Sequence, residues 1–189
     1  MYTVEKTSRA GSALMDIESY LLQEERSIYL TSEVNAASAS MVIMALQFLE
    51  RQSSQDIKLF IDSPGGTVPD GLAIVDAMER NRCDVVTICT GLAASMGAFI
   101  MAHGKKGKRY MTPHAEMMIH QPVASTGGQA SDIMLSAKHI EKTKDTLNEM
   151  LALATGKPVE VIACDTDRDY YLDALAAIEY GLADQILAK

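Results

Sequence analysis

The sequence predicts an α/β protein built on a mainly parallel sheet. Through the first half of the chain, β-branched or apolar runs alternate with segments of helical periodicity. Strands that alternate with helices in this way are typical of parallel sheets joined by helical crossovers. A helix predicted over about 131–154 is long for a chain of 189 residues, and its middle is polar, which indicates that it projects from the body.

Composition and charge place the chain among globular proteins and disfavour some partners. Hydrophobic residues make up 48% and charged residues 22% of the sequence, enough for a sizeable core in one domain over residues 1–189. The net charge of −8 disfavours nucleic acids and anionic membranes, because no basic cluster offsets it. Three cysteines without C-x-x-C spacing, and an N-terminus without the apolar core of a signal peptide, predict a cytoplasmic protein.

The elements of the first half follow from periodicity, capping residues and turn signals. Residues 85–102 carry no charge, but they contain glycines and hydroxyl side chains and change period midway, so we expect a buried strand and a buried helix rather than a membrane span. In order, the expected elements are a helix over about 13–23 capped by Ser12, a strand over 27–30, a helix from 35 or 38 to about 50, a strand over 57–61, a helix from Asp70, a strand over 85–90 and a helix over 98–102.

The second half begins with a lysine-rich turn at 104–108, which we expect to be solvated. A short apolar run over 117–120 ends at Gln121-Pro122, and Gly127-Gly128 precedes the long helix. The remaining expected elements are a short helix over 159–164, a strand over 170–172 and a last helix that Asp173 caps and Gly181 ends.

Ser95 lies where the strand after Asp84 gives way to small residues and then to a helix. A hydroxyl at such a junction sits beside unpaired backbone N–H groups, where a nucleophile and its oxyanion hole are both wanted. A serine between alanine and glycine is also common as a helix cap or as a packing residue. This stretch alone leaves both interpretations open.

Three further features, far apart in the sequence, suit the same reaction. A base must take the proton of an attacking hydroxyl, and His120, which ends an apolar run, is the candidate. The other three histidines have polar or loop surroundings and are expected at the surface. A carboxylate must orient the base, and the acidic turn offers Asp165, Asp167 and Asp169. The N–H groups of Gly66 and Met96 can stabilise the oxyanion, whereas no spacing favours a metal site.

Six motifs, in order and with matching spacing, resemble those of the ClpP serine peptidases, the proteolytic subunits of ATP-dependent Clp proteases. The resemblance covers nearly the whole chain. The motifs are Ser63-Pro64-Gly65-Gly66, residues 91–98 around Ser95, residues 104–109, Met118-Ile119-His120-Gln121-Pro122, residues 128–133 and residues 165–169.

The resemblance implies a role for each matching residue. Ser95 would be the nucleophile, His120 the base and Asp169, rather than Asp165 or Asp167, the orienting acid. The remaining implied positions are Gly66 and Met96 as oxyanion donors, Gly65, Val68, Pro122 and Val123 as substrate-binding residues, and Asp167 and Arg168 as contacts between rings. Lys58 and Asp62 depart from the usual pattern, in which an aromatic or bulky residue and an asparagine stand at these positions.

The resemblance also implies a fold and an assembly. The fold would be the spiral of ββα units shared with crotonases, with a protruding handle over about 125–154. Two stacked heptameric rings, of this chain alone or mixed with a paralogue, would enclose a chamber that a hexameric AAA+ Clp ATPase feeds with unfolded protein. No cofactor is expected, because the chain lacks a Walker loop and ATP use would lie in the partner.

Two other functions stay open at this point. A ring subunit without catalytic activity would act beside a paralogue. A crotonase-type acyl-CoA enzyme would share the fold and the oxyanion hole.

Overall fold

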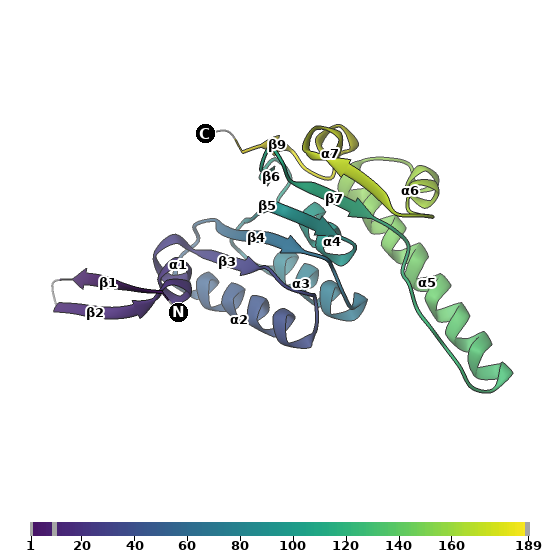
Figure 1. Ribbon diagram of the computed structural model, residues 1–189, viewed down its shortest axis with the longest axis horizontal. Coiled ribbons are helices and arrows are strands. Elements are labelled where there is room, and N and C mark those ends of the chain that lie inside the picture. The colour runs from purple at the N-terminus through teal and green to yellow at the C-terminus, as the bar shows by residue number, and fades with distance from the viewer. Residues whose placement is uncertain (1, 9–10, 188–189) are drawn as a thin grey trace.

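A seven-stranded sheet forms the centre of the computed structural model, which describes residues 2–8 and 11–187 (Figure 1). Its main path has the order β3-β4-β5-β6-β9, and β7 joins β5 to β8. Every pairing is parallel except that of β7 with β8, which confirms the predicted mainly parallel sheet. The strands are β3 (Ser27–Leu30), β4 (Ile57–Ser63), β5 (Val85–Ala94), β6 (Arg109–Met111), β7 (Glu116–Ile119), β8 (Tyr170–Asp173) and β9 (Gln185–Ile186).

Helices lie on both sides of this sheet, and α2 and α3 run side by side along one of them (Figure 1). Asn35 caps α2 by accepting from the N–H groups of Ala37 and Ser38, which decides between the two predicted starts. Helix α3 begins at Val68 after Thr67, so Asp70 lies in its first turn rather than at its start. The helices are α1 (Ile17–Glu25), α2 (Ala36–Gln52), α3 (Val68–Arg80), α4 (Met96–Ala102), α5 (Ala130–Thr155), α6 (Val159–Asp165) and α7 (Ala174–Tyr180).

The N-terminal region differs from the expectation. Strands β1 (Thr3–Ser8) and β2 (Gly11–Asp16) pair antiparallel and stand apart from the main sheet (Figure 1). The helix predicted from residue 13 therefore begins only at Ile17, and Asp16 caps it by accepting from the Ser19 N–H at 2.8 Å. The prediction of Ser12 as the cap was wrong.

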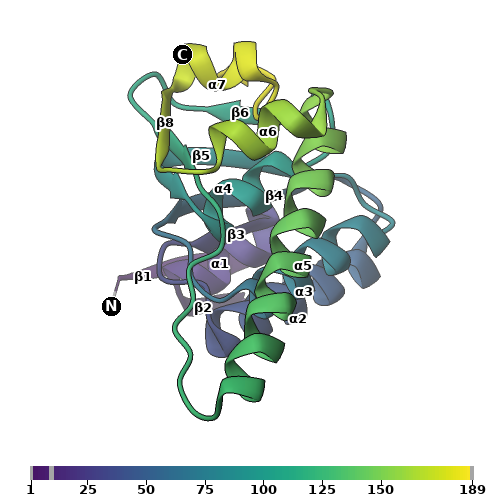
Figure 2. The same ribbon diagram turned by 90° about the vertical axis from the view of Figure 1, so that its right-hand side faces the viewer.

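The long helix α5 leaves the body, as predicted, and an extended segment over residues 120–129 leads to its far end (Figures 1 and 2). Its C-terminal part packs on the core through Leu147 and Leu151. Its first turns expose Met134 and Leu135. The structure thus has the fold that the resemblance implied, a mixed α/β body with a projecting helix.

The core is continuous from β3 to α7, and β5 and α4 run through it. All residues of α4 are buried, as are Val85–Cys89, which confirms the buried strand and helix predicted for this uncharged stretch. In the described part of the chain, no helix has the length and apolar character needed to cross a membrane. Residues 2–8 and 11–187 likewise hold no cluster of three histidine, cysteine or acidic side chains that could bind a metal ion.

Candidate active site

Ser95 occupies a sharp turn between β5 and α4. Its backbone has φ 53° and ψ −123°, a conformation that residues other than glycine rarely adopt. Two hydrogen bonds fix the turn: the Ser95 N–H donates to Met118 O at 2.8 Å, and the Phe99 N–H donates to Ser95 O at 3.0 Å. The turn presents the hydroxyl to the end of the neighbouring strand β7.

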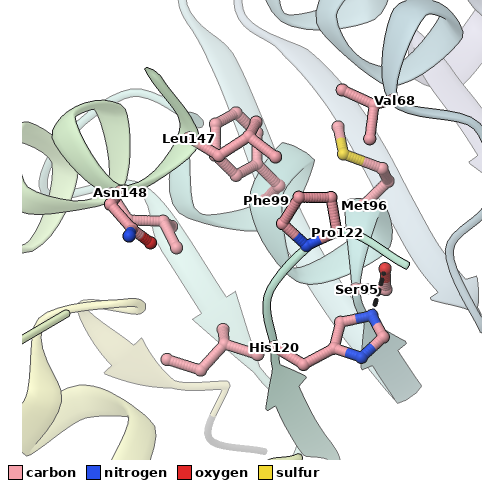
Figure 3. Close-up of a pocket in the computed structure, with 10 residues that line it drawn as sticks. Val68, Ser95, Met96, Phe99, His120, Pro122, Leu147 and Asn148 are labelled. Atoms are coloured by element: carbon pink, nitrogen blue, oxygen red, sulfur yellow. Dashed lines mark hydrogen bonds between the residues drawn. The ribbon is translucent and has the colours of Figure 1, made fainter. Parts of the chain in front are cut away.

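His120 directly follows β7, which pairs in parallel with the end of β5. The register Ala94↔Met118 brings the residues that follow the two strands close together, because parallel strands end at the same edge. His120 Nε2 lies 2.8 Å from Ser95 Oγ (Figure 3). The distance is that of a hydrogen bond between a hydroxyl and a base positioned to take its proton.

Asp169 is the acid of the late turn that reaches the histidine. Strand β8 pairs antiparallel with β7, and Ile119 is opposite Tyr170. One residue beyond this pair, Asp169 therefore lies opposite His120. Asp169 Oδ1 lies 3.2 Å from His120 Nδ1. Asp165 instead accepts from the Tyr180 hydroxyl at 2.7 Å, and Asp167 accepts from Gln121. The structure thus brings Ser95, His120 and Asp169 into one chain of contacts.

The glycine loop after β4 lies against the serine turn. A Cβ atom added to Gly65, whose φ is 89°, would be 2.7 Å from Ser95 Cβ and 2.8 Å from the Met96 nitrogen. Gly66 is just as tightly placed, because its Cβ would lie 2.1 Å from Val34 O. Only glycine allows the loop to approach so closely. Met96 begins α4, so its N–H has no carbonyl partner within that helix. The N–H groups predicted as oxyanion donors therefore come from two adjoining segments.

A model of the Clp protease family matches residues 9–189, nearly the whole chain. The chain belongs to the Clp protease family. This membership supports a serine peptidase of the ClpP type that forms oligomers and associates with Clp ATPases.

A narrow pocket opens beside the Ser95 hydroxyl of this Clp protease chain (Figure 3). Of the predicted substrate-binding residues, Val68 and Pro122 line it, whereas Gly65 and Val123 do not, and Val123 is exposed. The other residues that line it are Ser95, Met96, Phe99, Ile119, His120, Leu147, Asn148 and Leu151. The mostly apolar walls suit an uncharged side chain of a peptide next to the scissile bond.

Sequence reasoning missed the part of α5 that closes this pocket. Asn148 is buried between Leu147 and Leu151, and Thr166 Oγ1 lies 3.1 Å from its Oδ1. A lone amide on the apolar face of a predicted helix was the available signal, since buried polar groups need a partner. This signal was missed because the long helix was predicted to project from the body.

The remaining histidines and the predicted ring contacts differ in their exposure. His103 is not a surface residue: it is half-buried, its ring stacks on Phe99, and burial lowers its pKa. His114 and His139 are exposed, as predicted. The side chains of Asp167 and Arg168, predicted as ring contacts, are 57% and 90% exposed.

Asp62, one of the departures from the family pattern, supports the strand that leads to Ser95. The pairing of β4 with β5 shifts between Ile61 and Ser63, so β5 bulges there. Asp62 Oδ1 accepts from the Leu92 N–H at 2.9 Å within this bulge. A carboxylate thus provides the acceptor that a bulged N–H requires.

Proposed function

We propose that the chain is a serine endopeptidase, the proteolytic subunit of an ATP-dependent Clp protease, and that it cleaves unfolded polypeptides to short peptides. The observation that carries this proposal is the 2.8 Å contact between Ser95 Oγ and His120 Nε2, with Asp169 at the other ring nitrogen. Membership of the Clp protease family supports the same chemistry.

The proposed reaction follows from this arrangement. Ser95 Oγ attacks the peptide carbonyl while His120 takes the hydroxyl proton, and Asp169 stabilises the resulting imidazolium. The N–H groups of Gly66 and Met96 bind the oxyanion of the tetrahedral intermediate. His120 then gives its proton to the leaving amine, which leaves an acyl ester on Ser95. A water molecule, activated by the same histidine, hydrolyses this ester and restores the free serine.

The proposal includes an assembly. Two stacked heptameric rings, of this chain alone or with a paralogue, would enclose the active sites in a cytoplasmic chamber. A hexameric AAA+ Clp ATPase would unfold and deliver the substrate, so this chain needs no cofactor of its own. The exposed apolar residues at the start of α5 and the exposed pair Asp167 and Arg168 support contacts between subunits.

A fluorophosphonate probe tests the nucleophile. We expect the probe to label the wild-type protein and the variant Ser40→Ala, which changes an exposed serine on α2, but not Ser95→Ala. A short fluorogenic peptide and the native mass should be measured on the same samples. Labelling that survives in Ser95→Ala would refute the assignment. Turnover of an acyl-CoA without peptidase activity would favour the crotonase-type enzyme, and activity that appears only with a paralogue would favour an accessory subunit.

A further inference from the structure

Asp169 is held in place by its segment of chain rather than by burial. Its side chain is 59% exposed, whereas that of His120 is 20% exposed. An exposed carboxylate rotates and hydrates freely, so a productive contact with His120 depends on how the backbone around it is fixed. We call residues 166–169, which connect α6 to β8, the acid loop.

The C-terminal end of the acid loop is fixed by the sheet. Tyr170 begins β8 and pairs with Ile119, the residue before His120. The N-terminal end of the loop lies beyond this pairing, so a further contact with the segment that carries His120 is needed to hold both ends of the loop against it.

Gln121 supplies that further contact. Its backbone N–H donates to Thr166 O at 2.6 Å. Its side-chain Nε2 donates to Asp167 O at 2.7 Å and to Asp167 Oδ1 at 3.2 Å. Both side-chain partners are acceptors, so the amide must turn its NH₂ group toward them. Gln121 directly follows the base, and its partners Thr166 and Asp167 lie three and two residues before the acid.

Other contacts hold the acid loop to different parts of the molecule. Thr166 Oγ1 contacts Ile162 O and Asn148 Oδ1, on α6 and α5. The Tyr180 hydroxyl on α7 donates to Asp165 just before the loop. These bonds hold the acid loop on the helices. The bonds of Gln121 are different, because they connect the loop to the segment that carries His120.

We propose that Gln121 is a positioning residue for peptide hydrolysis: it holds the acid loop so that Asp169 stays against His120. The proposal rests on the function proposed above. It assigns the effect to the donor group of the side chain, because the two Asp167 atoms that this group contacts, O and Oδ1, are both acceptors. The backbone bond to Thr166 persists in any variant, so the expected loss is partial.

Three substitutions separate the donor from the size of the side chain. Gln121→Glu keeps the shape but replaces the NH₂ group with an acceptor, Gln121→Ala removes the group, and Gln121→Lys keeps a donor of similar reach. The matched control is Gln52→Glu, the same change at an exposed glutamine at the end of α2. Steady-state hydrolysis of a fluorogenic peptide, the labelling rate of Ser95 by a fluorophosphonate and the native mass are measured for each.

We expect kcat to fall about tenfold in Gln121→Glu and Gln121→Ala, because the side-chain bonds to Asp167 are lost, with KM changed less than about twofold. The labelling rate should fall in parallel, Gln121→Lys should retain most of the activity, and Gln52→Glu should match the wild type. A kcat of Gln121→Glu within twofold of the wild type would overturn the proposal, as would equal losses in Gln121→Glu and Gln121→Lys. Should Gln121→Glu fail to assemble, the comparison of the alanine and lysine variants decides. If the wild-type protein itself is not labelled at Ser95, the proposed function fails instead.

Discussion

Replacement of Asp169 by asparagine isolates the contribution of one negative charge to the reaction. Two unit charges 3.2 Å apart attract by about 1.3 kcal/mol in surroundings like bulk water and by about 5 kcal/mol at an effective dielectric constant of about 20. Because Asp169 is 59% exposed and His120 20% exposed, the stabilisation of the imidazolium lies between these limits. We expect kcat of Asp169→Asn to fall about 10²-fold, equivalent to about 2.7 kcal/mol.

The assay is hydrolysis of a short fluorogenic peptide, with the native mass recorded for each sample. Asp76→Asn, which changes an exposed carboxylate on α3, is the matched control and should leave kcat unchanged. An unchanged kcat in Asp169→Asn with normal assembly would show that this carboxylate does not orient or stabilise the base. A loss as large as that of Ser95→Ala would refute the argument that solvent screens the pair.

Two further predictions concern stability. Burial lowers the pKa of His103 below 6.5, although the bond to Phe99 O opposes this, so the unfolded chain binds more protons below that pH. The free energy of unfolding should therefore decrease as the pH falls from about 6.5 toward 5, and urea titrations of His103→Gln should show a smaller decrease; equal pH dependence would contradict this. Ser95→Gly should be at least as stable as Ser95→Ala in thermal unfolding, because glycine accepts a φ of 53° whereas alanine bears about 1–3 kcal/mol of strain. If Ser95→Ala were instead more stable than Ser95→Gly by about 0.5–1 kcal/mol, the usual advantage of alanine over glycine in regular structure, the turn would not be strained.

Most regular elements could be predicted because their apolar spacing reports burial. Helix α2 buries Val42, Leu46 and Leu49 on one face, and the sequence shows this stripe directly. The strand pair β1–β2 gave no such signal, since it stands apart from the main sheet and Leu14 is exposed. Strands β6 and β9 have three and two residues, too few for any period to appear.

The location of the candidate site could be predicted because its residues follow the ends of predicted strands. Ser95 and His120 each come after an apolar run, and the parallel pairing of β5 with β7 joins them. The strain at Ser95 was not predictable, because nothing local marks a serine for positive φ. The conformation of the turn goes together with Gly65, because the absence of a side chain there lets the loop after β4 pack against Ser95.

The choice among three aspartates depends on the register of β8, which the sequence specifies only weakly. A shift by one residue would place Arg168 opposite His120 instead of Asp169, since the strands run antiparallel. Burial opposes such a shift at one position, because it would turn Leu172, the one buried side chain of β8, out of the core. At one end of the strand, Asp173 Oδ1 caps α7 by accepting from the Ala176 N–H at 2.9 Å. At the other end, Gln121 binds the acid loop. The cap at Asp173 and the bonds of Gln121 thus hold the two ends of β8 in the register that places Asp169 opposite His120.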